Sequence, residues 1–213
     1  MTAGPVRIGL TGPIGCGKST VAGWLESLGG RLVDMDALAR HATAPGTSTL
    51  PAIRNCFGDR VFAADGSLDR AALAAIVFRD PAALADLERI VHPAVRERLV
   101  EEVAAASAAG VPFIVIEAIK LVESGIAADC DAVWIVDCSQ EAQRARLSVR
   151  GLAPEDAERR MAAQGIGLAD RLVARCTSEL PSVPVWRLVT DGPAAGVRTA
   201  VERALQEVLS SRR

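Results

Sequence analysis

A lysine and a serine that follow a glycine-rich segment form the part of this sequence with the clearest chemistry. Residues 12–19 read GPIGCGKS and fit the pattern G-x-x-x-x-G-K-[S/T]. The glycines allow backbone conformations in which successive N–H groups turn inward and bind phosphate oxygens. In such a loop the lysine neutralises the charge of the β- and γ-phosphates, and the serine hydroxyl ligates Mg²⁺. We therefore predict an ATP and Mg²⁺ site made by Gly15, Cys16, Gly17, Lys18, Ser19 and Thr20, with Lys18 catalytic and Ser19 a metal ligand.

The residues around this loop predict the strand and the helix that a phosphate loop requires. Residues 6–11 are a short apolar segment, and residues 19–28 place their apolar side chains on one helical face. The helix start adds its own N–H groups and the positive end of its dipole. Only Lys18 and Lys120 are lysines among 24 basic residues. A chain that otherwise uses arginine thus has lysine in this loop, where its compact ammonium acts as a point charge on a phosphate. Cys16 is expected to be inert, although its oxidation would block the site.

Composition excludes several classes of protein. The 213 residues, half of them apolar, suit one domain, and the net charge of −2 comes without a basic run of the kind that binds nucleic acid. No apolar run has membrane-spanning length and no apolar leader precedes the first strand, so we expect a cytoplasmic protein with no membrane partner. Five cysteines without a C-x-x-C pair argue against zinc and fit a reducing compartment. We expect a monomer or a weak homo-oligomer.

The order of elements predicts an α/β fold. Apolar strands are expected at residues 6–11, 31–34, 111–117, 132–137 and 185–189. Their alternation with helices predicts an open, mostly parallel sheet of about five strands with helices on both faces, and ligands at the carboxyl ends of the strands. Residues 69–109 are predicted to be helical, with Pro93 opening a separate helix. This excursion is longer than a simple crossover needs and indicates a subdomain that faces the substrate.

Carboxylates follow several of these strands. Asp34, Asp36, Glu117 and Asp137 stand at or just after strand ends, where they could coordinate Mg²⁺ or accept a hydroxyl proton. The single asparagine, Asn55, rules out the N-K-x-D motif that reads guanine, which argues against a GTPase switch. These features favour a compact small-molecule kinase.

A series of segments resembles the dephospho-CoA kinase family in order and spacing. The loop with its strand comes first, and residues 28–36, LGGRLVDMD, resemble that family's D-x-D segment. The later matches are Phe57-Gly58, DGSLDR at 65–70, IVF at 76–78, LERIVHP at 87–93, QRARL at 143–147, and Gln164. The resemblance runs from about residue 6 to residue 165. Two segments depart from the family pattern: residues 117–123, EAIKLVE, stand where it has D-x-P-L-L-x-E, and residues 183–192 keep little of its A-D-x-x-I-x-N segment.

The resemblance implies both a fold and an activity. The fold is the three-layer fold of P-loop kinases, as one domain over residues 6–209. Its core would comprise 6–45, 111–140 and 183–209, its helical CoA-binding subdomain about 46–110, and its helical lid about 148–168. The activity is phosphoryl transfer from ATP to the 3′-hydroxyl of dephospho-CoA, the final step of coenzyme A biosynthesis. Two alternatives stay open: a nucleoside or nucleotide kinase, and a non-catalytic nucleotide-binding protein.

The acidic candidates have distinct predicted roles. Asp36, which matches the second acid of the D-x-D segment, is predicted to orient or deprotonate the acceptor hydroxyl. The alternative is that Asp36 caps the next helix. Asp34 could instead be the metal-side partner. Glu117 is predicted to be a metal-side carboxylate, and the alternative is a structural carboxylate bonded to the loop.

The basic candidates lie in the lid-like stretch and on the substrate side. Arg144, Arg146, Arg150, Arg159 and Arg160 fall close together, and a closing arginine can stabilise the transferring phosphoryl group. We assign Arg146 to ATP binding and Arg150 to catalysis, and expect the others to form a solvated face.

Substrate binding is assigned to Asp36, Arg40, His92 and Lys120. His92 follows from the family match, and its alternative is a cap or a packing residue. Lys120 could reach a phosphate of the CoA moiety or of ATP, and its alternative is an exposed loop lysine.

Overall fold

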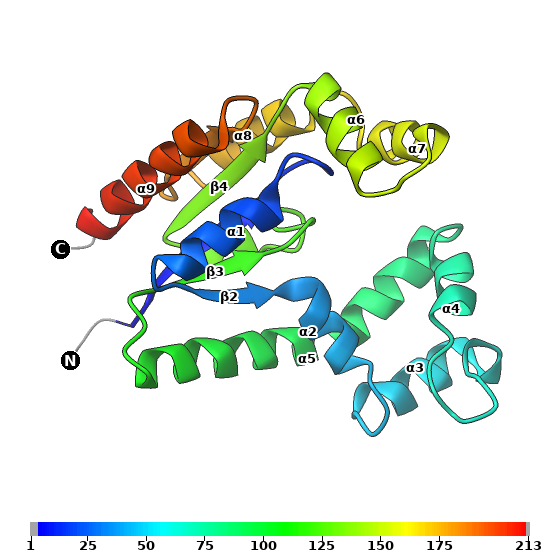
Figure 1. Cartoon of the computed structure of the whole chain (residues 1–213). Helices are drawn as coiled ribbons and strands as arrows, with labels where there is room; N and C mark the ends of the chain where they lie inside the picture. Colours follow the sequence, from blue (N-terminus) through cyan, green and yellow to red (C-terminus); the bar gives the residue numbers. More distant parts are fainter. Residues whose placement is uncertain (1–3, 212–213) are drawn as a thin grey trace. The chain divides into compact units, whose positions relative to one another are not determined.

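Five short apolar segments form one sheet. They are β1 (Val6–Thr11), β2 (Arg31–Asp34), β3 (Phe113–Glu117), β4 (Ala132–Asp137) and β5 (Val185–Val189). Their order across the sheet is β2-β3-β1-β4-β5, and β1 pairs in parallel with both β3 and β4, as β4 does with β5. Figure 1 labels β2, β3 and β4 of this sheet. The predicted α/β fold with a parallel sheet of about five strands is confirmed. The carboxyl ends of its central strands therefore share one edge.

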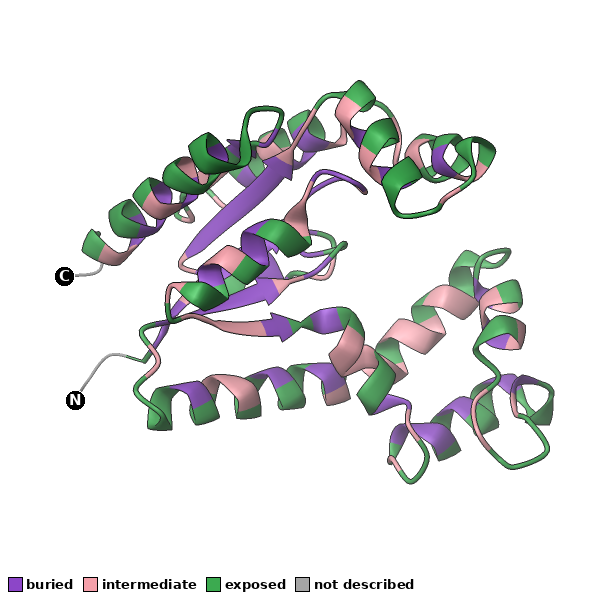
Figure 2. Ribbon diagram, in the orientation of Figure 1, coloured by how far each residue is buried: buried purple, intermediate pink, exposed green. Residues whose placement is uncertain are grey.

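Both faces of the central strands are covered. Ile8, Leu10 and Trp134 pack on one face with α1 (Lys18–Ser27) and α9 (Ala194–Ser210). Residues of the opposite parity, such as Ile114 and Ile135, are fully buried too, and α8 (Leu168–Glu179) contacts β4 and β5. Figure 2 shows these strands as buried along almost their whole length. Such continuous burial explains why they read as unbroken apolar runs.

The computed structural model describes residues 4–211, and the chain divides into two compact units. One comprises the chain up to Val33 and from Ala106 onward. It carries the sheet with the elements named above, α6 (Gln140–Val149), α7 (Pro154–Gln164) and the short 3₁₀ helix η2 (Ile126–Asp129). The other unit is Asp34–Ala105. Residues 34–45, which we assigned to the core, therefore group with the helical unit.

The helical unit has a core of its own. Its elements are α2 (Met35–Ala42), α3 (Thr49–Phe57), the 3₁₀ helix η1 (Asp59–Val61), α4 (Arg70–Val77) and most of α5 (Pro81–Ala108). Ile53, Phe57, Val61, Leu73 and Val77 are buried together.

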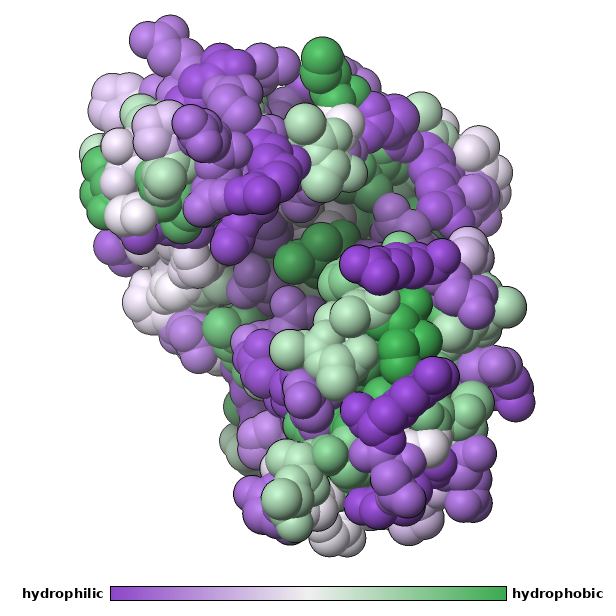
Figure 3. All heavy atoms as spheres, turned by 90° about the vertical axis from the view of Figure 1, so that its right-hand side faces the viewer, coloured by the Kyte–Doolittle hydropathy of each residue, from purple (hydrophilic) through white to green (hydrophobic). Residues whose placement is uncertain are grey.

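No helix in the described part of the chain combines the length and apolarity that a membrane span needs. In Figure 3, hydrophilic side chains predominate on the visible face and hydrophobic ones lie among them in smaller groups.

Helix α5 corrects one prediction. A new helix was predicted to open at Pro93, but α5 runs unbroken from Pro81 to Ala108 with Pro93 inside it. An internal proline costs about 3 kcal/mol, because it lacks an N–H and its ring meets the carbonyl one turn earlier. Burial on both sides of the proline offsets this cost. Leu84 and Leu87 pack on the core of the helical unit, and Val95 and Leu99 are buried further along the helix.

Replacing Pro93 should therefore stabilise the protein. Pro93→Ala restores the missing N–H and removes the ring, which stabilises the helix. Alanine also leaves the unfolded chain more conformational freedom, which cancels part of this gain, so we expect the free energy of unfolding to rise by about 1–2 kcal/mol. Pro81→Ala is the matched control, because a proline at the first helical position costs little. Urea denaturation of both variants measures the difference. Equal stabilities of the two variants would contradict this account of α5.

Candidate active site

The phosphate loop depends on two glycines in conformations that side chains would prevent. Gly12 has a φ of 141°, and a Cβ there would lie 2.1 Å from the carbonyl oxygen of Val136. Gly17 has a φ of 90° and is the N-cap of α1, where no side chain caps the helix. The first N–H groups of a helix have no acceptor within it. The start of α1 thus offers donors and the positive end of a dipole to an anion.

Three of the predicted catalytic and ATP-binding residues meet at this loop. The ammonium of Lys18 donates to the carbonyl oxygens of Gly12 at 2.8 Å and of Pro13 at 3.1 Å. Arg150, at the end of α6, donates through Nη2 to the Ser19 hydroxyl at 3.4 Å. These contacts hold both cations over the loop. A phosphate is a stronger acceptor than a carbonyl and can take over the bonds of Lys18.

Thr190 ties the loop to the ends of β4 and β5. Its hydroxyl lies 2.8 Å from the carbonyl oxygen of Cys16, to which it donates, and its N–H donates to the carbonyl oxygen of Asp137 at 2.9 Å. Arg146 completes the group, with Nη1 2.8 Å from the Thr190 hydroxyl and Nη2 2.5 Å from its carbonyl oxygen. Arg146 was predicted to belong to the site, whereas Thr190 was not. The available signal was its place directly after the last strand, at the edge where ligands bind.

A pocket of about 420 Å³ opens beside these residues. Its walls come from α1, α6, α9 and the segment after β5, and they are mainly apolar. The lining residues are Gly17, Thr20, Val21, Trp24, Ala145, Arg146, Val149, Arg150, Thr190, Gly192, Ala194 and Val197. A pocket with apolar walls and a few polar groups next to a phosphate loop is suited to the base of a nucleotide.

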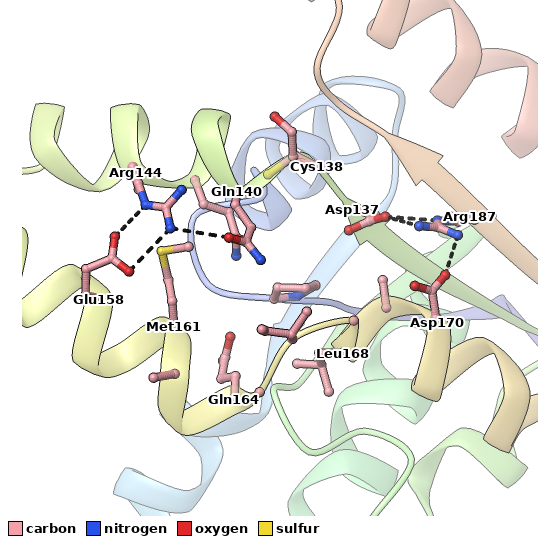
Figure 4. A pocket seen from close by; sticks show the side chains of 18 residues that line it. Asp137, Cys138, Gln140, Arg144, Glu158, Met161, Gln164, Leu168, Asp170 and Arg187 are labelled. Carbon is pink, nitrogen blue, oxygen red and sulfur yellow. Dashed lines mark hydrogen bonds and ion pairs between the residues drawn. The ribbon is translucent and has the colours of Figure 1, made fainter.

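Figure 4 shows a second pocket, also of about 420 Å³, whose charged side chains already have partners. Arg187 lies 2.5 Å from the carboxylate of Asp137 and 2.7 Å from that of Asp170. Arg144 contacts Glu158 at 2.5 Å, and this hydrogen bond lowers the pKa of Glu158. Asp137, one of the strand-end carboxylates, is therefore held by Arg187.

Glu117 and Lys120 lie at the carboxyl edge of β3. Glu117 is the last residue of β3, half-buried, and is paired in register with Leu10 of β1. The chain then stays beside the strand that leads into the loop, because the Thr11 hydroxyl donates to the carbonyl oxygen of Ile119 at 3.2 Å. Lys120 follows at an exposed position. Both predicted residues thus belong to the same unit as the loop.

In the helical unit, the two acids of the D-x-D segment have different surroundings. Asp34 is the N-cap of α2: its carboxylate accepts from the Ala37 N–H at 3.0 Å and lies 3.6 Å from Arg40. Asp36 is in the first turn of α2 and exposed, and no residue within 4–211 bonds to its carboxylate. The capping role considered for Asp36 therefore belongs to Asp34.

His92 is exposed on α5. Since the helix is continuous there, His92 cannot cap a helix start, and its exposure excludes a packing role. Its side chain is accessible to a ligand.

Comparison with known proteins identifies the family. Residues 6–175 match the model of the dephospho-CoA kinase family. The chain belongs to this family. It is 47% identical over 158 residues to the dephospho-CoA kinase of Symbiobacterium thermophilum. The aligned region covers 74% of this chain and 66% of that protein. It is 35% identical over 210 residues to the dephospho-CoA kinase of Chlorobaculum tepidum, with coverage of 97% and 96%.

Solved structures show the same fold. The crystal structure of TT1252 from Thermus thermophilus matches with a TM-score of 0.77 and 35% identity over 98% of both chains. Dephospho-CoA kinase from Campylobacter jejuni shares the fold, with a TM-score of 0.66, 22% identity and coverage of 97% and 98%. The resemblance drawn from the motifs is confirmed, and with it the P-loop kinase fold.

The Thr190 hydroxyl should matter to nucleotide binding in this family member. Thr190→Val keeps the shape of the side chain but removes the hydroxyl that bonds the Cys16 carbonyl oxygen and Nη1 of Arg146, while Nη2 of Arg146 keeps its bond to the backbone carbonyl oxygen of residue 190. We expect the free energy of unfolding to fall by about 1–3 kcal/mol and the Kd for ATP to rise by about tenfold. Thr199→Val is the matched control, because that hydroxyl lies on the exposed face of α9 and bonds the Ala195 carbonyl oxygen within its own helix. Calorimetric titration with ATP decides between them, and equal Kd values would count against a role for Thr190.

Proposed function

We propose that this kinase transfers the γ-phosphoryl group of ATP to the 3′-hydroxyl of dephospho-CoA, giving CoA and ADP. The observation that carries the proposal is the family match over residues 6–175, which includes a phosphate loop with Lys18, Ser19 and Arg150 gathered at it. The loop supplies the donor half of the reaction. The identity of the acceptor is inferred from the family match.

ATP would bind with its phosphates at the loop and its base in the apolar pocket beside it. The N–H groups of Gly15, Gly17 and the first turn of α1 would bind the β- and γ-phosphates. Trp24 and Val149 would contact the base, since both line that pocket. Arg146, held by Thr190 at the pocket wall, would add positive charge between base and phosphates.

Mg²⁺ fits the residues that are present. Among the described residues no group of three or more acids, histidines or cysteines could hold a metal by itself. Nucleotide kinases need no such cage, because Mg²⁺ takes most of its ligands from phosphates and water. Ser19, exposed at the start of α1, and Glu117, at the end of β3, would supply the protein ligands. When bound, the ion neutralises charge on the β- and γ-phosphates.

The transfer itself would be direct and in line, with no phosphorylated enzyme. The Asp36 carboxylate would accept the proton of the acceptor hydroxyl or orient it, and it has no competing partner within residues 4–211. Lys18 and Arg150 would stabilise charge on the transferring group. Arg40, His92 and Lys120 would bind the acceptor. Arg40 and His92, both exposed in the helical unit, would contact polar groups of the acceptor, and Lys120 would contact one of its phosphates.

The expected cellular setting follows from the substrates. ATP and dephospho-CoA are small soluble molecules, so we propose that the protein acts in the cytoplasm, with no nucleic-acid or membrane partner. We propose a monomer or a weak homo-oligomer. We further assign the segment of about 148–168, which contains α7, as the lid, because Arg150 at its start already contacts the loop.

A substrate panel tests the assignment. ADP release is measured with dephospho-CoA, nucleosides and nucleoside monophosphates as acceptors. We expect turnover with dephospho-CoA alone. Turnover of a nucleoside or nucleotide instead would favour the alternative kinase, and ATP binding without turnover of any acceptor would favour a non-catalytic nucleotide-binding protein.

Two matched aspartate variants test the mechanism. Asp36→Asn should lower kcat by about 10²–10⁴-fold while the Kd for ATP stays unchanged, because only proton transfer is lost. Asp34→Asn should retain most activity, since asparagine caps helices as well as aspartate does. The comparison uses kcat from ADP release and Kd from calorimetry. If Asp34→Asn loses the activity and Asp36→Asn keeps it, the two roles must be exchanged.

A further inference from the structure

One residue of the phosphate loop is held by side chains from two other helices. The N–H of Ile14 donates to Oε1 of Gln164 at 2.8 Å, and its carbonyl oxygen accepts from Nε2 of Gln143 at 2.7 Å. Gln143 is buried on α6, and Gln164 is the last residue of α7. Both backbone polar groups of Ile14 are therefore occupied by amide side chains.

The chemistry of Ile14 fixes which end of each amide faces it. An N–H needs an acceptor and a carbonyl needs a donor, so Gln164 must present its oxygen and Gln143 its nitrogen. Gln164 is itself anchored, because Nη2 of Arg171 on α8 donates to its carbonyl oxygen at 2.7 Å. The two glutamines are thus not interchangeable, although they bind the same residue.

These two hydrogen bonds to the backbone of Ile14 matter because the loop is rich in glycine. Glycine loses more conformational freedom on ordering than any other residue, and a loop that is ordered only by its ligand binds that ligand more weakly. Ile14 directly precedes Gly15, the first residue that we assign to phosphate binding. Holding both polar groups of Ile14 fixes the direction in which the Gly15 N–H points before ATP arrives.

We propose that Gln143 and Gln164 are positioning residues that order the phosphate loop for ATP, with Gln164 linking the loop to α7. The proposal rests on the proposed ATP-dependent activity of the chain. Its consequence is specific. ATP affinity depends on a hydrogen-bond acceptor at residue 164 and on a donor at residue 143.

Glutamate at each position tests this polarity at equal charge. Gln164→Glu keeps the acceptor for the Ile14 N–H, whereas Gln143→Glu sets a carboxylate against the Ile14 carbonyl oxygen. We expect Gln143→Glu to raise the Kd for ATP about tenfold more than Gln164→Glu does. Gln164→Leu, which keeps neither group, should bind ATP about tenfold more weakly than the parent protein. Calorimetric titration with ATP alone measures these values, so the result does not depend on which acceptor the enzyme uses.

Further variants guard against a merely structural effect. Gln143→Met keeps length and apolar packing without a donor, and it replaces Gln143→Glu if the charge prevents folding. Gln206→Glu, on the exposed side of α9, is the control for added charge. The KM for ATP should rise while the KM for the acceptor stays constant. Equal ATP affinities of Gln143→Glu and Gln164→Glu, or a rise confined to the acceptor KM, would overturn the proposal.

An independent observation concerns two cysteines at the same loop. The Sγ atoms of Cys16 and Cys138 lie 2.7 Å apart, and both thiols are free. Cys16 is buried in the loop, and Cys138 directly follows β4. A disulfide needs a separation of about 2.05 Å, so the sulfurs would have to approach by about 0.6 Å. No other cysteine pair within the described residues has such a contact.

The two thiols differ in reactivity. The hydrogen bond with Cys16 and then the charge of Arg146 lower the pKa of Cys138, while that same hydrogen bond and burial raise the pKa of Cys16. The thiolate therefore forms at Cys138, which is only partly buried. Burial raises the pKa of Cys130 to about 12 and also raises that of Cys176, so these two thiols are poor nucleophiles.

We infer that peroxide oxidation joins Cys16 to Cys138 and thereby weakens ATP binding. The Cys138 thiolate attacks one oxygen of hydrogen peroxide, the O–O bond breaks, and hydroxide leaves with a sulfenic acid on Cys138. The Cys16 sulfur then displaces the sulfenic hydroxyl, which leaves as water with the Cys16 proton. Overall the two thiols lose two electrons and two protons, and the peroxide is reduced to two water molecules. The new bond draws Cys16 toward β4 and moves the flanking Gly15 and Gly17.

Peroxide treatment in a Cys56→Ser background tests this inference, because Cys56 is the exposed thiol. We expect intact mass to fall by two hydrogens, the Kd for ATP to rise at least about fivefold, and dithiothreitol to restore both. By reciprocity, bound ATP should shift the thiol–disulfide equilibrium of this pair, measured in a dithiothreitol redox buffer, toward the two free thiols. Cys138→Ser in the same background should show neither change. A mass gain from sulfinic acid without a crosslink, or a crosslinked protein with unchanged ATP affinity, would overturn the inference.

Discussion

The site depends on the close approach of the loop backbone to the end of β4 at Gly12. A side chain there would meet the carbonyl oxygen of Val136 at 2.1 Å, so the loop can leave β1 in this direction only with glycine. This contact sets the position of the chain from Pro13 to Ser19 against the carboxyl edge of the sheet. Gly17, at the far end, then allows α1 to start uncapped toward an anion.

Side chains from later segments hold the loop in this place. Thr190 and Arg146 connect the Cys16 carbonyl to the ends of β5 and β4, while Gln143 and Gln164 connect Ile14 to α6 and α7. Each of these bonds is modest on its own, worth about 1 kcal/mol. The four side chains come from three segments, α6, α7 and the residue after β5, all of them far from the loop in the chain. A flexible, glycine-rich loop thus receives its order from outside itself.

The local parts of this arrangement could be predicted from sequence, and the long-range parts could not. Strand β1, the loop and α1 form a continuous pattern of apolar residues, glycines and a lysine, and helix α7 begins and ends as its proline and glycine indicate. Helix α5 was divided wrongly at Pro93, since packing outweighed a local signal against the helix. Thr190 was missed because it bonds Cys16, which is 174 positions away in the sequence, and a single hydroxyl at such a distance gives no periodic or spacing signal. Gln164 was noticed only as a family match, with no role.

The two aspartates of the D-x-D segment show why residue type alone does not determine role. Both are exposed and separated by one residue, yet the junction of β2 and α2 gives them different tasks. Asp34 is still extended, so its side chain can fold back on the Ala37 N–H and cap the helix. Asp36 is already helical, so its side chain projects outward and cannot reach the first-turn donors. A capped start keeps α2 in place without using the second acid. The carboxylate that remains available for proton transfer is therefore the one that the helix does not need.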